Sequence, residues 1–255
     1  MIRLKTKTDI IKLREGGRRL AQILQTVKTK VIPGVSTASL DALAQEMIKE
    51  LGDKPAFLNY RPAGVKKPYP AALCVSVNDE IVHGIPGARV LQEGDLVTID
   101  LGLKHDGLIT DSAITVPVGR VSPEAISLMT ATEESLKLAI KAVKPGATIG
   151  DIGVAVETYI KKQGLGLVRD LAGHGVGYAV HEEPLVPNYG HKGQGEVLRP
   201  GLVIAIEPMV TLGSEKTKVL DDEYTFITKD GSLSAHFEHT VVVTDKGVEV
   251  LTTCS

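Results

Sequence analysis

Residues 31–52 of the chain read VIPGVSTASLDALAQEMIKELG, and residues 143–164, VKPGATIGDIGVAVETYIKKQG, align with them without a gap. Each stretch has a Pro-Gly pair that stops one helix, a hydroxyl residue at the N-cap of the next, a helix with apolar positions, and a closing glycine. The same order of signals at two distant places predicts an internal duplication.

Two shorter matches follow in the same order. VHGIP at 82–86 corresponds to VHEEP at 180–184, and LQEGDLVTID at 91–100 corresponds to LRPGLVIAIE at 198–207. Three matches in one order predict two related αβ halves packed about a pseudo-twofold axis. A cleft at the seam between two such halves is a natural place for a ligand site.

Helical and strand-like segments alternate along the rest of the chain. Apolar residues recur every three to four positions over 9–30, and Ser122 followed by Pro123 predicts a helix that runs to about residue 143. Residues 71–77 and 96–103 have the character of strands, and strands dominate from 201 to 250. This mixture of helices and hairpins predicts the α+β class rather than a doubly wound sheet.

The composition argues against several kinds of protein. A formal net charge of −2 gives no electrostatic argument for a nucleic-acid partner. The opening residues, MIRLKTKTD, are too polar for a secretory signal, and no apolar run approaches the roughly 18 residues of a membrane helix. With only Cys74 and Cys254, a reducing cytosol is the expected compartment. The length of 255 residues allows one large domain or two small ones.

Two aspartates lie on neighbouring strand-like segments. Asp100 lies in LVTIDLGL and Asp111 in LITDSAITV, with the turn sequence KHDG between them. A turn centred near His105–Asp106 would bring them opposite each other, within about one residue of register, with Cβ atoms roughly 4.5–5.5 Å apart. Like charges at that separation repel unless a cation lies between them. The alternative is that the two side chains point to opposite faces and never meet.

The second half repeats the pattern with two glutamates. Glu207 ends the apolar run LVIAIEPM, where an unpaired charge is costly, and Glu238 lies in SAHFEHTVVV after the turn KDGS. A cross-strand ion pair with a lysine is an alternative for Glu238, although it does not explain four acids at related positions. The internal repeat sets Glu207 against Asp100, and His181 against His83.

A glycine-rich stretch, DLAGHGVGYAVHEEP at 170–184, contains His174 and His181. It is either part of a catalytic or metal site or a flexible loop with incidental histidines, and the spacing does not tell which histidine is a ligand. Four carboxylates and one imidazole match neither a structural zinc site nor a calcium loop. They suit a pair of first-row divalent ions such as Mn, Fe or Co, which can activate a shared water for hydrolysis.

Five motifs in order, namely HGIP, IDLG with TDSA, AGHGVG followed by HEEP, IEPM, and FEHT, resemble those of the type I methionine aminopeptidases, which have the pita-bread fold. The resemblance extends over nearly the whole chain. It implies a single catalytic domain over 1–255, with internal halves of roughly 1–120 and 121–255 and antiparallel sheets covered by helices.

The resemblance also implies the chemistry, position by position. Two divalent metal ions, Co, Mn, Fe or Zn, would be bound by five side chains. These ligands correspond to Asp100, Asp111, His174, Glu207 and Glu238. Asp111 and Glu238 would bridge the ions, and Glu207 would pass on the proton of the attacking water. His181 would hydrogen-bond the scissile carbonyl and its oxyanion, and His83 would contact the substrate near the scissile amide.

The implied activity is removal of the initiator methionine from nascent proteins and peptides, by a monomer in the cytoplasm, with a preference for a small second residue. Phe57, Tyr60, Tyr69 and Cys74 match positions that line the methionine pocket. Plain core packing is the alternative for Phe57 and Tyr60, and a small buried hydrophobic role is the alternative for Cys74.

Leu171 and Val180 depart from the family pattern, because bacterial relatives often carry aromatic residues at these positions. We expect selectivity for methionine with an altered fit, since aliphatic side chains can still enclose a thioether. RPAGVKKP at 61–68 looks like an insertion. Its lysines would either contact the ribosome or a nascent chain, or form a solvated loop.

Two further features concern the surroundings of the site. Asn78 and Ser234 resemble positions that bind a monovalent cation in some relatives. Alternation along the strand puts His236 on the same face as Glu238, where it could support that acid, and His239 on the other face.

Two other functions compete with an aminopeptidase. The proline-specific peptidases, aminopeptidase P and prolidase, share the fold and the five ligands. HGIP near residue 83 argues against them, as does IEPM where those enzymes usually have glycine after Glu-Pro. A non-catalytic peptide-binding relative would typically lack ligands, whereas this chain retains all five.

Overall fold

The computed structural model describes residues 2–254. Its helices are α1 Lys7–Lys28, α2 Thr37–Glu50, α3 Pro123–Ala142 and α4 Ile149–Gln163. The predicted start signals act as N-caps, since the Ser36 and Ser122 side chains each accept a hydrogen bond from the third residue of their helix. Gly164 closes α4 in the left-handed conformation with a φ of 69°, as predicted.

The strands form four sheets in the described part of the chain. Their bounds are β1 Lys54–Pro55, β2 Leu73–Val77, β3 Glu80–Val82, β4 Leu96–His105, β5 Leu108–Pro117, β6 Gly166–Leu167, β7 Gly173–Gly175, β8 Glu182–Val186, β9 Val203–Ile206, β10 Met209–Thr211, β11 Thr217–Val219, β12 Phe226–Thr228, β13 Ser234–His236, β14 His239–Thr244 and β15 Gly247–Val250. One sheet has the order β1-β4-β2 with β5 beside β4, and the largest has the order β15-β14-β9-β7-β8. Two smaller sheets have the orders β13-β10-β6 and β11-β12-β3.

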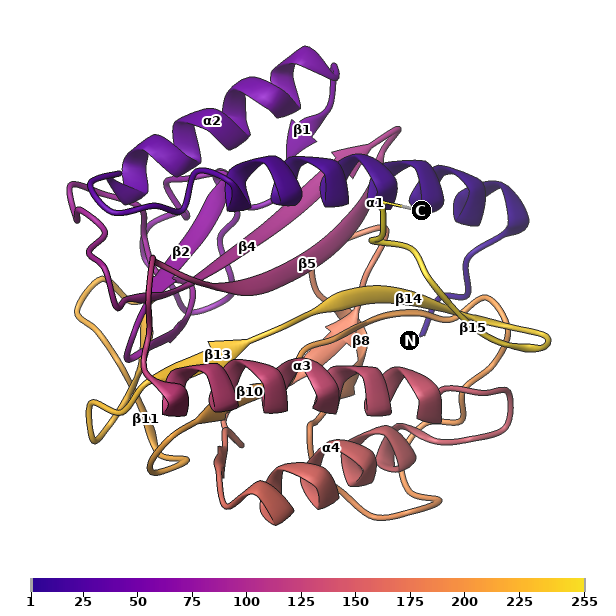
Figure 1. The fold of residues 1–255 in the computed structure, drawn as a ribbon. Helices are drawn as coiled ribbons and strands as arrows, with labels where there is room; N and C mark the ends of the chain where they lie inside the picture. Colours follow the sequence, from indigo (N-terminus) through magenta and orange to yellow (C-terminus); the bar gives the residue numbers. More distant parts are fainter. Residues whose placement is uncertain (1, 255) are drawn as a thin grey trace.

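All of these pairings are antiparallel. Helices cover the sheets in both halves (Figure 1). α1 and α2 pack on β2, β4 and β5, whereas α3 and α4 pack on strands of the second half, including β6, β8 and β13. The α+β class predicted from the sequence is therefore confirmed.

The predicted duplication recurs in the backbone hydrogen bonds. An isolated bridge joins Ser36 to Val90 in the first half, and another joins Thr148 to Val197 in the second. The sequence alignment pairs Ser36 with Thr148 and extends to pair Val90 with Val197. Both halves therefore attach the start of a helix to the segment before an inner strand in the same way.

Each half has its own buried core. Leu20, Ile48 and Ile99 belong to the first, and Val156 and Ile204 belong to the second. Burial of such an aliphatic side chain contributes about 1.5–3 kcal/mol to the free energy of unfolding. The two cores hold the inner strands rigidly, so that residues at the seam between the halves have fixed positions.

The seam itself is polar and joins β5 to the start of β14. The Thr240 hydroxyl accepts from the Asp111 N–H at 2.9 Å and donates to the Asp111 carbonyl at 2.7 Å. The Ser112 hydroxyl donates to the Glu238 carbonyl at 2.6 Å, and the Glu238 N–H donates to the Ala113 carbonyl at 2.9 Å. These bonds set Asp111 and Glu238 side by side, one from each half.

Among residues 2–254, no helix has both the length and the apolar character needed to cross a membrane.

Candidate active site

The β4–β5 hairpin carries the two aspartates of the first half. Its turn is formed by Asp106 and Gly107, whose φ values of 47° and 85° are both positive, as a two-residue type I′ turn requires. The turn is therefore centred one residue beyond the expected His105–Asp106 position. Asp-Gly supplies the required backbone conformation, which His105 would have to adopt at greater cost.

This shift changes the register of the aspartates. Asp100 faces Ala113 and Asp111 faces Gly102, so the prediction that the aspartates lie within about one residue of register was wrong. They are diagonal neighbours on the same face, a relation that spaces residues roughly 7–8 Å apart and their Cβ atoms somewhat closer. Both carboxylates line one cavity, which excludes the alternative that they point to opposite faces.

Glu207 follows β9, and Glu238 lies between β13 and β14, so both glutamates reach the same cavity from the second half. The Nε2 atom of His236 lies 3.7 Å from Glu207 Oε2 and 3.9 Å from Glu238 Oε2. The expected position of His236 beside Glu238 is therefore confirmed. His239 faces elsewhere, since its Nδ1 lies 2.9 Å from the Thr252 hydroxyl.

His174 lies on the short strand β7 between two glycines. A Cβ at Gly173 would collide with the Ala205 carbonyl, and a Cβ at Gly175 would collide with the Glu183 carbonyl. The glycines thus let β7 pack tightly between its neighbours. The His174 Nδ1 donates to the Gly175 carbonyl at 2.9 Å, which leaves Nε2 free, 3.5 Å from Glu207 Oε1.

The donor set fits divalent cations. One ligand atom from each of Asp111, His174 and Glu238 lies within 4.8 Å of the others, and all three residues are buried. Within the described part of the chain, Asp100 Oδ1, Asp111 Oδ1 and Glu238 Oε1 are buried oxygens that have no hydrogen-bond partner. Buried oxygens are normally hydrogen-bonded, so these atoms are placed as ligands would be.

Burial raises the pKa of all four carboxyl groups, and repulsion by neighbouring acids raises it further in three of them. Burial raises the pKa of Asp100 to about 7. Burial and the neighbouring acids raise the pKa of Asp111, Glu207 and Glu238 well above their ordinary values. Four carboxylates at this separation cannot all ionise near neutral pH without cations between them.

His181 lies at the mouth of the cavity, where its Nδ1 is 2.7 Å from the Tyr60 hydroxyl. Burial raises the pKa of Tyr60, so the phenol stays neutral and can donate to Nδ1. When the phenol donates in this way, the ring proton of His181 lies on Nε2. The ring also contacts His174, with ring centroids 4.4 Å apart. The bond between Tyr60 and His181 was not predicted from the sequence.

His83 has a left-handed backbone, with a φ of 61°. This conformation is strained by about 1–3 kcal/mol for a residue with a side chain, and such strain is concentrated at active sites. Burial lowers the pKa of His83 to about 4, so its imidazole is neutral at pH 7. Its ring packs edge-on against Phe226 and lines the same cavity as His181.

The pocket candidates lie together in this cavity. Phe57, Tyr60, Tyr69 and Cys74 all line it, and Leu171 and Val180 line it as well. The cavity volume is about 150 Å³. An engineered cavity of that size in another protein binds benzene, so one side chain of moderate size fits here.

Five further lining residues were not predicted as site residues, although Val82, Ala172 and Met209 lie within the quoted motifs VHGIP, AGHGVG and IEPM. They are Pro62, Val82, Ala172, Met209 and Tyr224. Tyr224 packs edge-on against Tyr69, with centroids 5.1 Å apart, and its hydroxyl donates to the Lys67 carbonyl at 2.6 Å. An aromatic residue within the acidic turn DDEYTF was the one signal that could have found it. The hydrogen bond between Tyr224 and Lys67 fastens the insertion at 61–68 to the second half beside the pocket.

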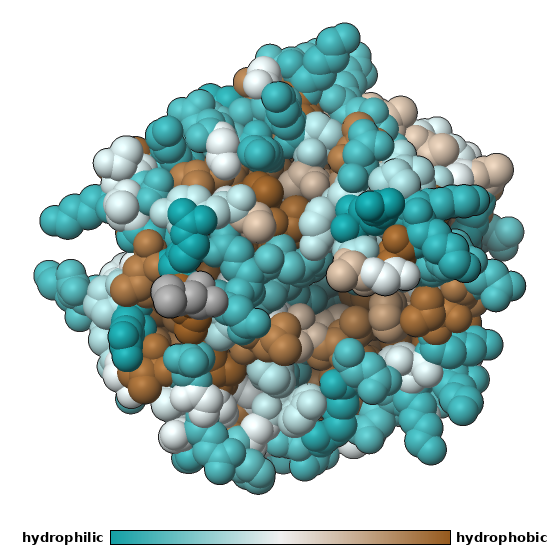
Figure 2. Space-filling model, turned by 180° about the vertical axis from the view of Figure 1, so that it is seen from behind, coloured by the Kyte–Doolittle hydropathy of each residue, from teal (hydrophilic) through white to brown (hydrophobic). Residues whose placement is uncertain are grey.

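Figure 2 shows the face opposite to the view in Figure 1. Hydrophobic residues gather across the middle of this face, and hydrophilic residues surround them at the rim. An apolar region of this kind on a protein surface is a common mark of a binding site.

Comparisons with known proteins identify the family of the chain. Residues 11–245 match metallopeptidase family M24. The methionine aminopeptidase of Aquifex aeolicus is 47% identical over 256 residues, covering 98% of this chain and 98% of that one. The crystal structure of a methionine aminopeptidase from Thermotoga maritima superposes with a TM-score of 0.95 at 42% identity, covering 99% of this chain and 100% of that one.

The fold extends to more distant proteins. A prolidase from Pyrococcus furiosus has a TM-score of 0.77 at 23% identity, and the match covers 99% of this chain but 66% of that one. This likeness shows a shared fold alone. The predicted pita-bread fold and the predicted resemblance to the type I methionine aminopeptidases are confirmed by the closer matches. The chain belongs to metallopeptidase family M24.

Proposed function

We propose that the chain is a metal-dependent aminopeptidase that removes the N-terminal methionine from peptides and nascent proteins. One observation carries the proposal. The five candidate metal ligands, His83 and His181 line the same small cavity as the candidate methionine pocket. Because the ligands come from both halves, we also propose that residues 1–255 act as a single catalytic domain.

The metal centre would be dinuclear. Two divalent ions would be held by Asp100, Asp111, His174, Glu207 and Glu238. When bound, such ions supply Lewis acidity that polarises a carbonyl and acidifies a water molecule. Four carboxylates and one imidazole suit Mn, Fe or Co, and Zn accepts the same donor types.

The protein side chains provide the proton transfers and the orientation. Glu207 accepts the proton of the attacking water and passes it to the leaving amine, because its carboxylate lies at the cavity wall beside His174. His181 directs Nε2–H at the scissile carbonyl, since Tyr60 occupies its Nδ1. This donor stabilises the charge that develops on the carbonyl oxygen. His83 lies near the scissile amide.

Selectivity follows from the apolar end of the cavity. Phe57, Tyr69, Cys74 and Tyr224 enclose it, and aromatic rings form favourable contacts with a thioether. Leu171 takes the place of an aromatic wall, which alters the fit. The Tyr60–His181 pair narrows the mouth, so a bulky second residue would clash there.

The experiment that tests this function uses the intact protein. The protein is stripped of metal, reloaded with Mn or Co, and assayed with Met-Ala-Ser and with an Xaa-Pro peptide. Metal-dependent release of methionine from Met-Ala-Ser is the expected result. Faster turnover of the Xaa-Pro peptide would assign the chain to the proline-specific peptidases instead, and binding without turnover of either would identify a non-catalytic peptide-binding protein.

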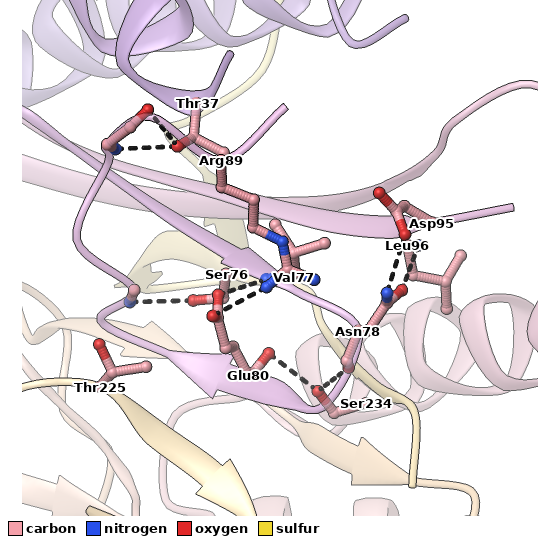
Figure 3. A network of polar contacts seen from close by, with 12 residues as sticks. Thr37, Ser76, Val77, Asn78, Glu80, Arg89, Asp95, Leu96, Thr225 and Ser234 are labelled. Carbon is pink, nitrogen blue, oxygen red and sulfur yellow. Dashed lines mark hydrogen bonds and ion pairs between the residues drawn. The ribbon is translucent and has the colours of Figure 1, made fainter. Parts of the chain in front are cut away.

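We also propose a monovalent cation beside Asn78 and Ser234. The Ser234 hydroxyl lies within hydrogen-bond distance, 3.0 Å, of the carbonyl oxygens of both Asn78 and Glu80, so three neutral oxygens lie close together (Figure 3). A higher unfolding temperature in potassium chloride than in choline chloride at equal ionic strength supports this cation, and equal temperatures contradict it.

The substrate class would be the N-terminus of a peptide or nascent protein, processed in the cytoplasm by a monomer. Transient contact with the ribosome is part of the proposal, because Lys66 in the 61–68 insertion is 85% exposed beside the pocket. Sedimentation of the purified protein tests the monomer. Its cosedimentation with ribosomes, compared with a Lys66→Ala, Lys67→Ala variant, tests the contact.

A further inference from the structure

The turn that carries His181 is closed by the residue that follows it. Residues 176–181 connect β7 to β8, and Glu182 is the first residue of β8. The Oε1 atom of Glu182 accepts hydrogen bonds from the Tyr178 N–H and, at 2.9 Å, from the Ala179 N–H. Two hydrogen bonds to one carboxylate oxygen therefore close the turn next to His181.

The other oxygen of Glu182 binds a lysine from the start of the chain. Lys5 Nζ lies 2.6 Å from Glu182 Oε2, and the two side chains are only 1% and 12% exposed. The backbone N–H of Lys5 donates to the Gly201 carbonyl at 2.7 Å, which fixes this segment on the second half. Burial lowers the pKa of Lys5, and the bond to Glu182 opposes that shift.

The surrounding contacts are built around this ion pair. A Cβ at Gly177 would lie 2.5 Å from Lys5 Cε, so the third glycine of GHGVG leaves room for the lysine stem. The Arg3 guanidinium lies 3.9 Å from the centroid of the Tyr178 ring, and the Tyr178 hydroxyl donates to Asp9 at 2.8 Å. Residues 3–9, which we call the strap, thus hold the turn from outside the cavity.

We propose that the strap is a positioning device for His181, acting through the buried Lys5–Glu182 ion pair. His181 contacts Tyr60 and His174 on the cavity side, and among the described residues Lys5 is the one side chain that forms an ion pair with the turn behind it. Lys5 and Glu182 are positioning residues, since neither lines the cavity. This inference rests on the proposed aminopeptidase function, in which His181 meets the developing oxyanion.

The expected effect follows from geometry. Removing Lys5 leaves Glu182 without its cation, so the carboxylate moves toward water and the turn loses its closure. A displacement of about 1 Å at a group that acts in the transition state lowers the rate by up to about 100-fold. Because His181 acts mainly on the transition state, kcat falls and KM changes little.

The test compares Lys5→Met and Glu182→Gln with the wild-type protein, all metal-loaded, at a temperature where circular dichroism shows every variant folded. Glu182→Gln keeps an oxygen that can close the turn but removes the ion pair. The matched control is Arg14→Met, which breaks the 2.6 Å ion pair between Arg14 and Glu249, away from the turn. We expect kcat to fall between about 10-fold and 100-fold in Lys5→Met and in Glu182→Gln, and to stay within twofold in the control.

The double variant Lys5→Met, Glu182→Gln adds a second criterion. Its kcat should be no lower than that of the worse single variant, because the two residues act through one interaction. A kcat of Lys5→Met within twofold of wild type, or losses in the double variant that multiply, would overturn the inference.

Side-chain ¹⁵N NMR of the metal-free protein gives a readout that does not depend on catalysis. The His181 signals, assigned by their loss in His181→Gln, should show Nε2–H with an accepting Nδ1 in wild type. In Lys5→Met the ¹⁵N chemical shifts of the two ring nitrogens should move toward the average of the two tautomers, as expected for a ring that no longer bonds to Tyr60. Unchanged His181 signals overturn the positioning role. If wild type cleaved no peptide, the proposed function would fail, and these signals would still decide whether the strap positions His181.

Discussion

At the scale of single residues, Glu207 is the acid whose task is most specific. Its side chain is 13% exposed, and its oxygens lie 3.5 Å from His174 Nε2 and 3.7 Å from His236 Nε2. Both distances are too long for direct hydrogen bonds, so the carboxylate is held near its neighbours without being bound by them. A carboxylate in this state is free to exchange a proton.

Glu207→Gln tests that task. We expect kcat to fall by about 10²–10⁴-fold, because the amide cannot accept a proton. The unfolding temperature of the metal-free variant should not fall, since burial already disfavours the charged form of Glu207. Peptide hydrolysis and thermal denaturation measure the two effects. Glu93→Gln, an exposed acid paired with Arg120, is the control, and retained activity in Glu207→Gln would remove the proton-transfer role.

Residue types and repeats were enough to predict much of this site. Asp100 and Glu207 were identified because an acid ends an apolar run in both repeats. Spacing alone could not decide between His174 and His181, because the choice depends on which ring faces the carboxylates in the folded chain. The pairing of Tyr60 with His181 joins residues 121 positions apart, and no local pattern carries that information.

At the scale of elements, the β4–β5 hairpin shapes both the metal site and the pocket. Gly102 lies opposite Asp111 on β4. A Cβ at Gly102 would lie 2.6 Å from the Phe57 ring and 3.0 Å from the Ala56 Cβ. The missing side chain at this position lets Phe57 pack onto the strand beside the candidate ligands.

Gly102→Ala should therefore displace Phe57 from the pocket. We expect KM for a methionyl peptide to rise and the free energy of unfolding to fall by about 1–3 kcal/mol, as overpacking of a filled core does. Steady-state kinetics and urea denaturation measure these changes. Gly87→Ala is the matched control, because a Cβ there meets open space. Equal KM values in the two variants would contradict this role of Gly102.

The elements that could be predicted are those with local signals. Ser122 and Pro123 define the start of α3, and Gly164 defines the end of α4, through caps that depend on nearby residues only. The hairpin register was mispredicted because it depends on which two residues take positive φ. The sheet of β3, β11 and β12 pairs Phe226 with Val82, and such a distant pairing has no signature in a single strand.

At the scale of the whole molecule, the acids of the site couple its stability to pH and metal. In the metal-free protein the folded-state pKa of these acids lies above the unfolded values, which are about 3.9 for Asp and 4.3 for Glu. The folded state then binds more protons than the unfolded state, so the free energy of unfolding falls as pH rises toward the folded pKa.

Four histidines of the same site, His83, His174, His181 and His236, act in the opposite sense at lower pH, because burial lowers the pKa of each. Burial lowers the pKa of His83 to about 4 and that of His174 and His236 to about 3. The contribution of these histidines to the free energy of unfolding rises with pH and is complete above the unfolded histidine pKa of about 6.5. Above this pH, of the acids and histidines of the site only the carboxyl groups still change the free energy of unfolding as the pH rises, including Asp100 with a pKa of about 7.

We therefore expect the metal-free protein to lose stability as pH rises from about 6.5 to 8, and the metal-loaded protein to lose much less, because bound cations keep the carboxylates ionised in the folded state. Differential scanning calorimetry of both forms across this range measures the effect. A metal-free protein whose unfolding temperature rose over this range would show that the buried acids do not govern its stability.

The matching bridges Ser36–Val90 and Thr148–Val197 raise the question of why a site between two similar halves cleaves a peptide from one end only. Two identical copies of a half-chain, related by a twofold axis, would accept a peptide in either orientation with equal ease. Cleavage that always begins at the amino end requires unequal surroundings. The two halves differ at Asp100 against Glu207 and at Gly84 against Glu182. The end from which a peptide is cleaved is therefore determined by the residues that differ between the two halves.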